Sequence, residues 1–183
     1  MSNTTTLSDA EQIQQLKNQW MLSQIDVDFP TRESQLGSAC YLDVMEQNSA
    51  IMAFEGPTDP ALTPKGKLNW LKVDFHKLTV LFSQFYASHS AVAEASRDYL
   101  QEFLAQIILD DNSGHSLWVG LSDSAVSGCC IVSEKNQHLL ISDLLLNTEY
   151  DLAQEVPSII TGYTAMGHGV TWPVMVCPIS HIE

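Results

Sequence analysis

Three consecutive strand-like segments constrain the fold of this chain more than any other feature. They cover residues 116–121, 126–133 and 138–147, and short polar turns at 122–124 and 134–137 join them. Turns of this length favour antiparallel hairpins. The third segment is apolar at both odd and even positions, which is typical of a central strand covered on both faces. The sequence therefore predicts a sheet that lies between layers of helices.

The segments around these strands supply the helices and two further strands. Alternating residues predict a strand over 68–75, and apolar residues at helical spacing predict a helix directly after it and a second one from about Ser90 to Ile108. The same spacing predicts a helix around 152–163, with Pro157 in its first turn. Residues 170–178 complete the set as a last strand. The predicted fold class is α/β or α+β, with a mixed central sheet flanked by helices.

The first 66 residues are less regular and are interpreted as an N-terminal extension. Ser8 and Glu11 form a capping box, which predicts a helix over 9–23. Proline and glycine then surround two β-leaning runs, 40–45 and 50–54, which predict a hairpin. We expect this extension (1–66) to pack on a core (67–183) as one compact domain.

Composition and charge limit the classes of partner. The chain has 183 residues, 45% hydrophobic and 16% charged, which suits a buried core. Its formal net charge of −14 repels phosphate backbones and anionic membranes. We therefore expect no nucleic acid and no membrane among the partners.

The N-terminus and the cysteines favour a cytoplasmic location. The first basic residue is Lys17, and no segment is long and apolar enough for an export signal or a membrane span. The four cysteines are therefore expected to be reduced thiols. Neither the cysteines nor the histidines show metal-ligand spacing, so no metal site is predicted.

The order strand, helix, helix, three strands, helix, strand over 67–178 resembles the core of the GNAT superfamily of acyl-CoA-dependent N-acyltransferases. Residues 116–120 and 127–132 look like the second and third strands of that family, and 139–147 looks like its fourth. The resemblance implies a GNAT-like fold and acetyl-CoA or another acyl-CoA as cofactor. It also implies that the backbone of Leu144, Leu145 and Leu146 binds the acyl-pantetheine arm.

The turn after the fourth strand departs from the family pattern. In the family a glycine-rich turn and a helix N-terminus hold the pyrophosphate of coenzyme A. The matching residues here, 150–156, contain no glycine, and Asp151 and Glu155 add negative charge. Carboxylates close to a pyrophosphate oppose its binding. The only Lys or Arg from Asp98 to the end is Lys135, so the cofactor site is interpreted as degraded. The alternative is that folding brings basic residues near the first strand to the site: Lys65, Lys67, Lys72 and Lys77.

Asp143 is the candidate catalytic residue, because it is the single carboxylate within the apolar third strand. A buried Asp with a raised pKa would act as general base towards an amine. The alternative is a structural role, in which Asp143 either lies at a bulge and accepts hydrogen bonds from backbone N–H groups or faces a water-filled groove.

Two functions remain open. The first is an N-acyltransferase acting on a cationic small amine, with an open crevice between the fourth and fifth strands. The second is a non-catalytic acidic adaptor or chaperone-like protein that binds a basic protein, with that crevice filled by side chains. The family continues past its fifth strand, whereas this sequence stops soon after 178. Either the early hairpin covers the exposed sheet edge or a homodimer does.

Overall fold

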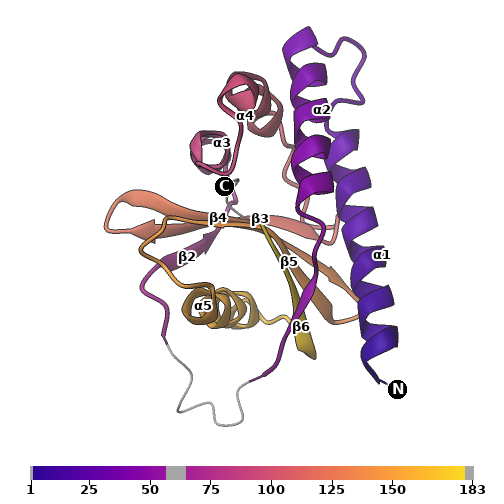
Figure 1. The fold of residues 1–183 in the computed structure, drawn as a ribbon, viewed down its shortest axis with the longest axis vertical. Helices are drawn as coiled ribbons and strands as arrows, with labels where there is room; N and C mark the ends of the chain where they lie inside the picture. The colour runs from indigo at the N-terminus through magenta and orange to yellow at the C-terminus, as the bar shows by residue number, and fades with distance from the viewer. Residues whose placement is uncertain (1, 57–64, 180–183) are drawn as a thin grey trace.

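The fold is a six-stranded mixed sheet between two layers of helices (Figure 1). A computed structural model describes residues 2–56 and 65–179, with side chains from Leu7 onward. The strands lie in the order β1-β6-β5-β4-β3-β2, and only β5 and β6 are parallel. Their bounds are Met52–Phe54 (β1), Asn69–Lys72 (β2), His115–Ser122 (β3), Ala125–Lys135 (β4), His138–Leu146 (β5) and Thr171–Pro178 (β6).

Helices cover both faces of this sheet, as expected. On one face lie Ser2–Ser23 (α1), Arg32–Gln47 (α2), His76–Ser88 (α3), a short 3₁₀ turn Glu94–Ser96 (η2) and Arg97–Ala105 (α4); Leu152–Ala165 (α5) lies on the other (Figure 1). The middle of β5 is buried throughout, as predicted for a central strand. The prediction of a mixed sheet flanked by helices is therefore confirmed, and its mostly antiparallel pairing is consistent with the α+β class. No helix in the described part of the chain has the length and hydropathy needed to cross a bilayer.

The predicted hairpin over 40–54 is wrong, because its first half belongs to α2. Thr31 caps this helix, and its side-chain oxygen accepts a hydrogen bond from the N–H of Ser34 at 3.1 Å. The buried side of α2 repeats every three or four residues, which is the helical period: Ser34, Gly37, Ser38, Tyr41, Val44 and Met45. Gly37 lets α2 approach α4 closely, since a Cβ there would lie 2.0 Å from the carbonyl oxygen of Tyr99.

The second half of that segment does cover the sheet edge. Residues 52–54 form β1, which pairs antiparallel with β6 in the register Met52↔Val176 and Phe54↔Val174. The extension therefore contributes the last strand of the sheet, beside β6. The edge at β6 is therefore covered by a strand of the same chain and not left for a second copy.

Other boundaries differ from the predicted ones in the details. The second helix of the core is shorter than expected, with α4 limited to nine residues. Pro157 lies inside α5 rather than in its first turn, since α5 begins at Leu152. The proline-rich residues 57–64, which contributed to the predicted boundary of the extension, lie outside the described residues.

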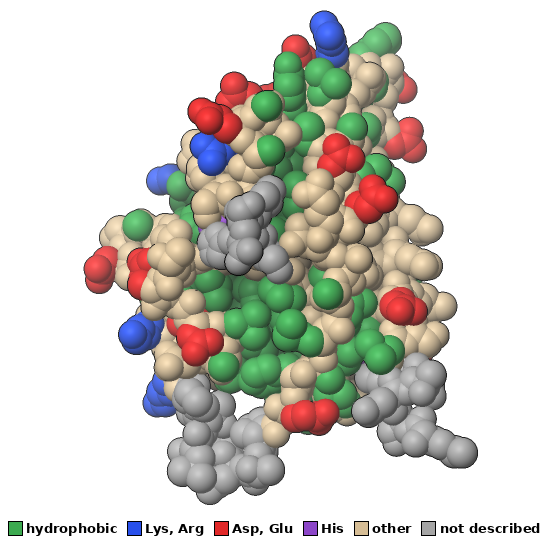
Figure 2. All heavy atoms as spheres, in the orientation of Figure 1, with side chains coloured by type: hydrophobic (Ala, Val, Ile, Leu, Met, Phe, Trp, Pro, Cys, Tyr) green, Lys and Arg blue, Asp and Glu red, His purple; other side chains and the backbone are tan. Residues whose placement is uncertain are grey.

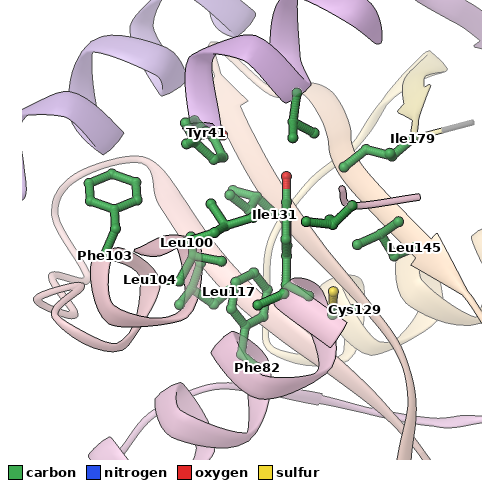
Figure 3. Packing of buried hydrophobic residues seen from close by; sticks show 14 of the residues in the cluster. Tyr41, Phe82, Leu100, Phe103, Leu104, Leu117, Cys129, Ile131, Leu145 and Ile179 are labelled. Atoms are coloured by element: carbon green, nitrogen blue, oxygen red, sulfur yellow. The ribbon is translucent and has the colours of Figure 1, made fainter. Parts of the chain in front are cut away.

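The core divides into two main apolar layers, one on each face. Figure 3 shows the layer beneath α2, α3 and α4, in which Tyr41 and Phe103 lie near Leu117, Ile131 and Leu145 of the sheet. The layer beneath α5 contains Trp70 and Trp118, and Gly162 of α5 lies directly on the Trp118 ring. Burial of this apolar area is the main source of stability for such a fold. A smaller cluster joins α1 to β5 and β6.

Candidate functional site

Asp143 lies at a bulge in β5, where the strand register shifts against both neighbours. The shifts fall between Cys129 and Ile131 on β4 and between Ser142 and Leu144 on β5. Asp143 has a φ of 53°, in the left-handed region that residues other than glycine seldom adopt. The bulge turns its carboxylate towards the helices α1, α2 and α3, whose side chains it contacts.

The carboxylate of Asp143 is fully engaged by three side chains. Its Oδ2 accepts from Nζ of Lys17 at 2.7 Å, and its Oδ1 accepts from the hydroxyls of Tyr41 at 2.8 Å and Tyr86 at 2.9 Å. Nζ of Lys17 also donates to the hydroxyl of Tyr41 at 2.6 Å. Lys17 and Asp143 form an ion pair with no exposed side-chain surface. The predicted bulge is present, but the bonds to Asp143 come from side chains rather than backbone N–H groups.

Burial dominates the electrostatics of this network. It raises the pKa of the Tyr41 and Tyr86 hydroxyls well above their ordinary value, and the negative charge of Asp143 raises both further. The same two causes raise the pKa of Cys177 to about 11. These groups remain protonated at neutral pH, so the tyrosines act as hydrogen-bond donors to the carboxylate.

The candidate acyl-binding backbone is engaged by the chain itself. The carbonyl of Leu144 accepts from the N–H of Ile179 at 3.1 Å, which extends the pairing of β5 with β6. The carbonyl of Leu146 is 2.9 Å from Nε2 of His89, and Leu145 pairs with Cys129 of β4. Figure 3 shows Ile179 beside Leu145, and Ile179 is buried in the core cluster on that face. Backbone pairing therefore keeps β5 and β6 together as far as Leu144, and the side chain of Ile179 is buried beside it.

Two carboxylates in the first turn of α5 have partners within the chain. The side chain of Asp151 is the N-cap and accepts from the N–H of Ala153 at 2.9 Å. Glu155 is buried and turns towards β2, where it accepts from the N–H of Lys67 at 2.7 Å and from Nε1 of Trp70 at 3.0 Å. Glu155 therefore fixes the start of β2 to α5, a role that its position in the sequence did not indicate.

An open pocket of about 370 Å³ lies where β5 ends. Its lining is polar with one aromatic wall and includes a carboxylate but no Lys or Arg: Phe85, Ser88, His89, Ser90, Val126, Asn147, Thr148 and Glu149. Electrostatically such a lining favours a cationic group over a phosphate. No group of three or more His, Cys, Asp or Glu in the described ranges is arranged to hold a metal ion.

Sequence reasoning found Asp143 but missed Lys17, Tyr41 and Tyr86. Lys17 follows Ile13 and precedes Met21 by four residues, so it lies within the buried stripe of α1. A charged residue within an apolar helical stripe was the available signal, because a buried lysine requires a partner. Tyr41 and Tyr86 are 102 and 57 positions from Asp143, and nothing local in the sequence indicates such contacts.

Comparison with known proteins adds no family to this description. No known family model matches the sequence, and no curated protein is significantly similar to it. The fold and the chemistry of the site are therefore the grounds for a functional proposal.

Proposed function

We propose that this chain is a non-catalytic acidic binding protein for a basic partner, built on a GNAT-like sheet. The likeness in fold is supported by the strand order, by the parallel pair β5 and β6, and by the bulge in β5. The strand β1 lies antiparallel to β6, at the edge that later strands occupy in that family.

The proposal that the chain is non-catalytic rests on the occupation of its expected acyl-CoA site. The positions that would hold an acyl-CoA are taken by groups of the same chain, since Ile179 bonds to Leu144 and Asp151 caps α5. The pocket at the end of β5 adds the carboxylate of Glu149, and no Lys or Arg lines it. A pyrophosphate at the start of α5 would meet the carboxylate of Asp151, which already caps the helix. The exposed Lys67 lies next to the same turn, because its N–H donates to Glu155, and its charge favours the second candidate below.

Surface charge supports the basic partner. Exposed carboxylates gather on the connection before α2, on α2 itself and around α4, two helices that pack against each other. Figure 2 shows acidic side chains over the upper part of the molecule, with Lys or Arg side chains between them. Arg32 and Arg97 are the basic residues within these segments, so the carboxylates outnumber them. We name this surface the acidic helix face, and its carboxylates are Asp26, Asp28, Glu33, Asp43, Glu46, Glu94, Asp98 and Glu102. Such a field attracts cationic segments and speeds their association.

The test is a titration with an acetylated oligolysine peptide at several salt concentrations. We expect binding that weakens steeply as salt increases, because exposed charges are screened. The double variant Asp43→Asn/Glu46→Gln should bind more weakly. The matched variant Glu11→Gln/Asp123→Asn removes the same charge from other exposed positions and should bind as the wild type does. Equal loss in both variants, or no binding at low salt, contradicts the proposal.

The acyltransferase remains the second candidate, favoured by the bulge at Asp143. In that function acetyl-CoA would be the cofactor and a cationic amine the acceptor, with Asp143 as base and Leu144, Leu145 and Leu146 along the acyl arm. It requires the β5–β6 pairing to open at Ile179. A direct cofactor titration separates it from the first candidate, and its outcomes are given at the end of the Discussion.

A further inference from the structure

A receptor for a cation is built into the helix layer without any contribution from α1. Tyr41 of α2 and Tyr86 of α3 both donate to Oδ1 of Asp143, at 2.8 and 2.9 Å. Both hydroxyls are therefore directed at one oxygen, and Oδ2 is left for another donor. The groups that orient this carboxylate therefore belong to α2, α3 and β5, and none of them belongs to α1.

Lys17 of α1 fills this receptor with an ammonium group. Its Nζ lies 2.7 Å from Oδ2 of Asp143, 2.6 Å from the hydroxyl of Tyr41 and 3.3 Å from Sδ of Met45. It also lies 5.1 Å from the centre of the Tyr41 ring. A carboxylate, a hydroxyl oxygen and an aromatic ring together suit a primary alkylammonium, which has three N–H donors and a positive charge.

A buried hydroxyl next to the receptor has no partner. Ser142 precedes Asp143 and pairs with Ile131 and Cys177. These two partners belong to clusters on the face of the sheet that α1, α2, α3 and α4 cover. Its Oγ is buried without a hydrogen-bond partner among the described residues. Buried hydroxyls are normally satisfied, so this atom adds an unused polar contact on the same face as the carboxylate.

Helix α1 contacts the rest of the molecule through one stripe of buried side chains, flanked by the half-buried Trp20. Its buried side chains form a single stripe, which consists of Ala10, Ile13, Lys17 and Met21. Leu7 and Leu16 lie outside this stripe and are 42% and 39% exposed. Opening also lets both members of the buried ion pair recover their hydration, which offsets part of the lost attraction. An ion pair at the centre of the contact therefore makes opening less costly than a fully apolar contact would.

We propose that Asp143, Tyr41, Tyr86 and Met45 form a binding site for a primary alkylammonium, that Lys17 is its intramolecular ligand, and that α1 is a cover exchanged for the ammonium group of a cationic ligand. The inference rests on the proposed function, because it names where a basic partner would insert a lysine. A small alkylamine presents the same chemistry, and the experiment separates the two sources.

The first arm refills the site in the full-length variant Lys17→Ala. This substitution removes the atoms that n-propylammonium would replace. At about ten times its Kd, the amine should raise the melting temperature of the variant by about 3–6 °C. Tetramethylammonium, which has no N–H donor, should not raise it. Lys17→Met keeps the volume filled and should not respond to either ion.

The second arm uses the wild-type protein, so it does not depend on a variant that folds. Cys177 lies beneath α1, where Nε2 of Gln14 donates to its Sγ at 3.3 Å. Cys130 is buried on the opposite face, in the cluster beneath α5, and becomes exposed only on wider unfolding. An acetylated tetralysine peptide should accelerate alkylation of Cys177 by about threefold or more, because the ligand shifts the population towards the open state. Alkylation of Cys130 should stay at its rate without peptide.

Different outcomes separate this inference from the proposed function. The alkylation of Cys177 in the wild-type protein is measured with tetralysine and, separately, with n-propylammonium. If only tetralysine accelerates the alkylation, the ligand is a lysine-bearing partner. If both accelerate it, the site binds alkylammonium ions in general. Unchanged labelling of Cys177 with both ligands overturns the inference, as does equal acceleration of Cys177 and Cys130. If oligolysine still binds with its salt dependence while Cys177 is unaffected, the acidic helix face is the binding surface and the exchange of α1 is wrong.

Discussion

At the scale of single residues, the ion pair of Lys17 and Asp143 is the most unusual feature of the chain. Two opposite charges are removed from water, and their attraction only partly offsets the lost hydration. Their value lies in specificity, because a single carboxylate fixes the rotation and register of α1 on the sheet. The two tyrosine hydroxyls complete the network, so breaking any one contact leaves buried polar groups without partners.

The first prediction concerns this pair. Asp143→Asn should destabilise the fold by about 3–5 kcal/mol, because it leaves the Lys17 ammonium buried without a counter-charge. The double variant Lys17→Met/Asp143→Asn should recover much of that loss, since no charge is left buried. Urea unfolding followed by tryptophan fluorescence measures both. A loss below about 1 kcal/mol in Asp143→Asn would mean that the pair is open to water.

A second residue-scale prediction follows from His115. Burial and the charge of Lys17 lower its pKa to about 4, and its Nδ1 lies 2.9 Å from Oγ of Ser133. The unfolded chain therefore takes up a proton near pH 6.5, whereas the folded chain does not until about pH 4. Its contribution to stability is complete above pH 6.5 and is progressively lost as the pH falls towards 4.

The measurement is the free energy of unfolding at pH 7 and at pH 5. His115→Gln should lose less stability over this interval than the wild type. The exposed His76 provides the matched control, and His76→Gln should keep the wild-type dependence. Identical pH dependence in all three proteins would show that His115 does not contribute.

At the scale of elements, prediction succeeded where contacts are local and failed where they are not. The strands β3, β4 and β5 follow each other through short turns, so alternation alone located them. The helix α2 was missed because Pro30, Gly37 and the β-leaning run from Cys40 were interpreted as an irregular segment that leads into a hairpin. Tertiary packing against α4 decides this segment, and glycine is required there for close approach rather than for a turn.

The contact between α2 and α4 gives the third prediction. A methyl group at Gly37 would lie 2.0 Å from the carbonyl oxygen of Tyr99 and 2.6 Å from Cβ of Phe103. Gly37→Ala should therefore destabilise the protein by about 1–3 kcal/mol, despite the better helix propensity of alanine. Gly169→Ala is the control, because its added Cβ meets nothing nearer than 3.7 Å. A stabilising effect of Gly37→Ala in thermal unfolding would place α2 farther from α4.

The candidate site was predicted only in part, for a related reason. The sequence identified Asp143 as the one carboxylate in an apolar strand. It also showed that the turn before α5 contains no glycine. The cap formed by Asp151 and the burial of Glu155 against β2 depend on how α5 meets the sheet. Sequence position alone placed both carboxylates near a phosphate, whereas the structure directs Glu155 away towards Trp70.

At the scale of the whole molecule, the fold and the charge favour different functions. The proposed GNAT-like fold rests on the sheet order and on the bulge in β5. The proposed binding of cations without catalysis rests on the β5–β6 pairing at Leu144, the capped start of α5 and the net charge of −14. The extension of 66 residues brings these features together, because it supplies the edge strand β1, the ion-paired helix α1 and much of the acidic helix face.

The most direct test of this account is isothermal titration of the full chain with acetyl-CoA and with free CoA at low salt. Low salt gives a weak phosphate site its best conditions, because attraction to any remaining cation is least screened. The account predicts no heat of binding and no thermal stabilisation up to millimolar cofactor. Binding in the micromolar range would contradict it, and would show that the β5–β6 pairing opens at Ile179 to admit the cofactor.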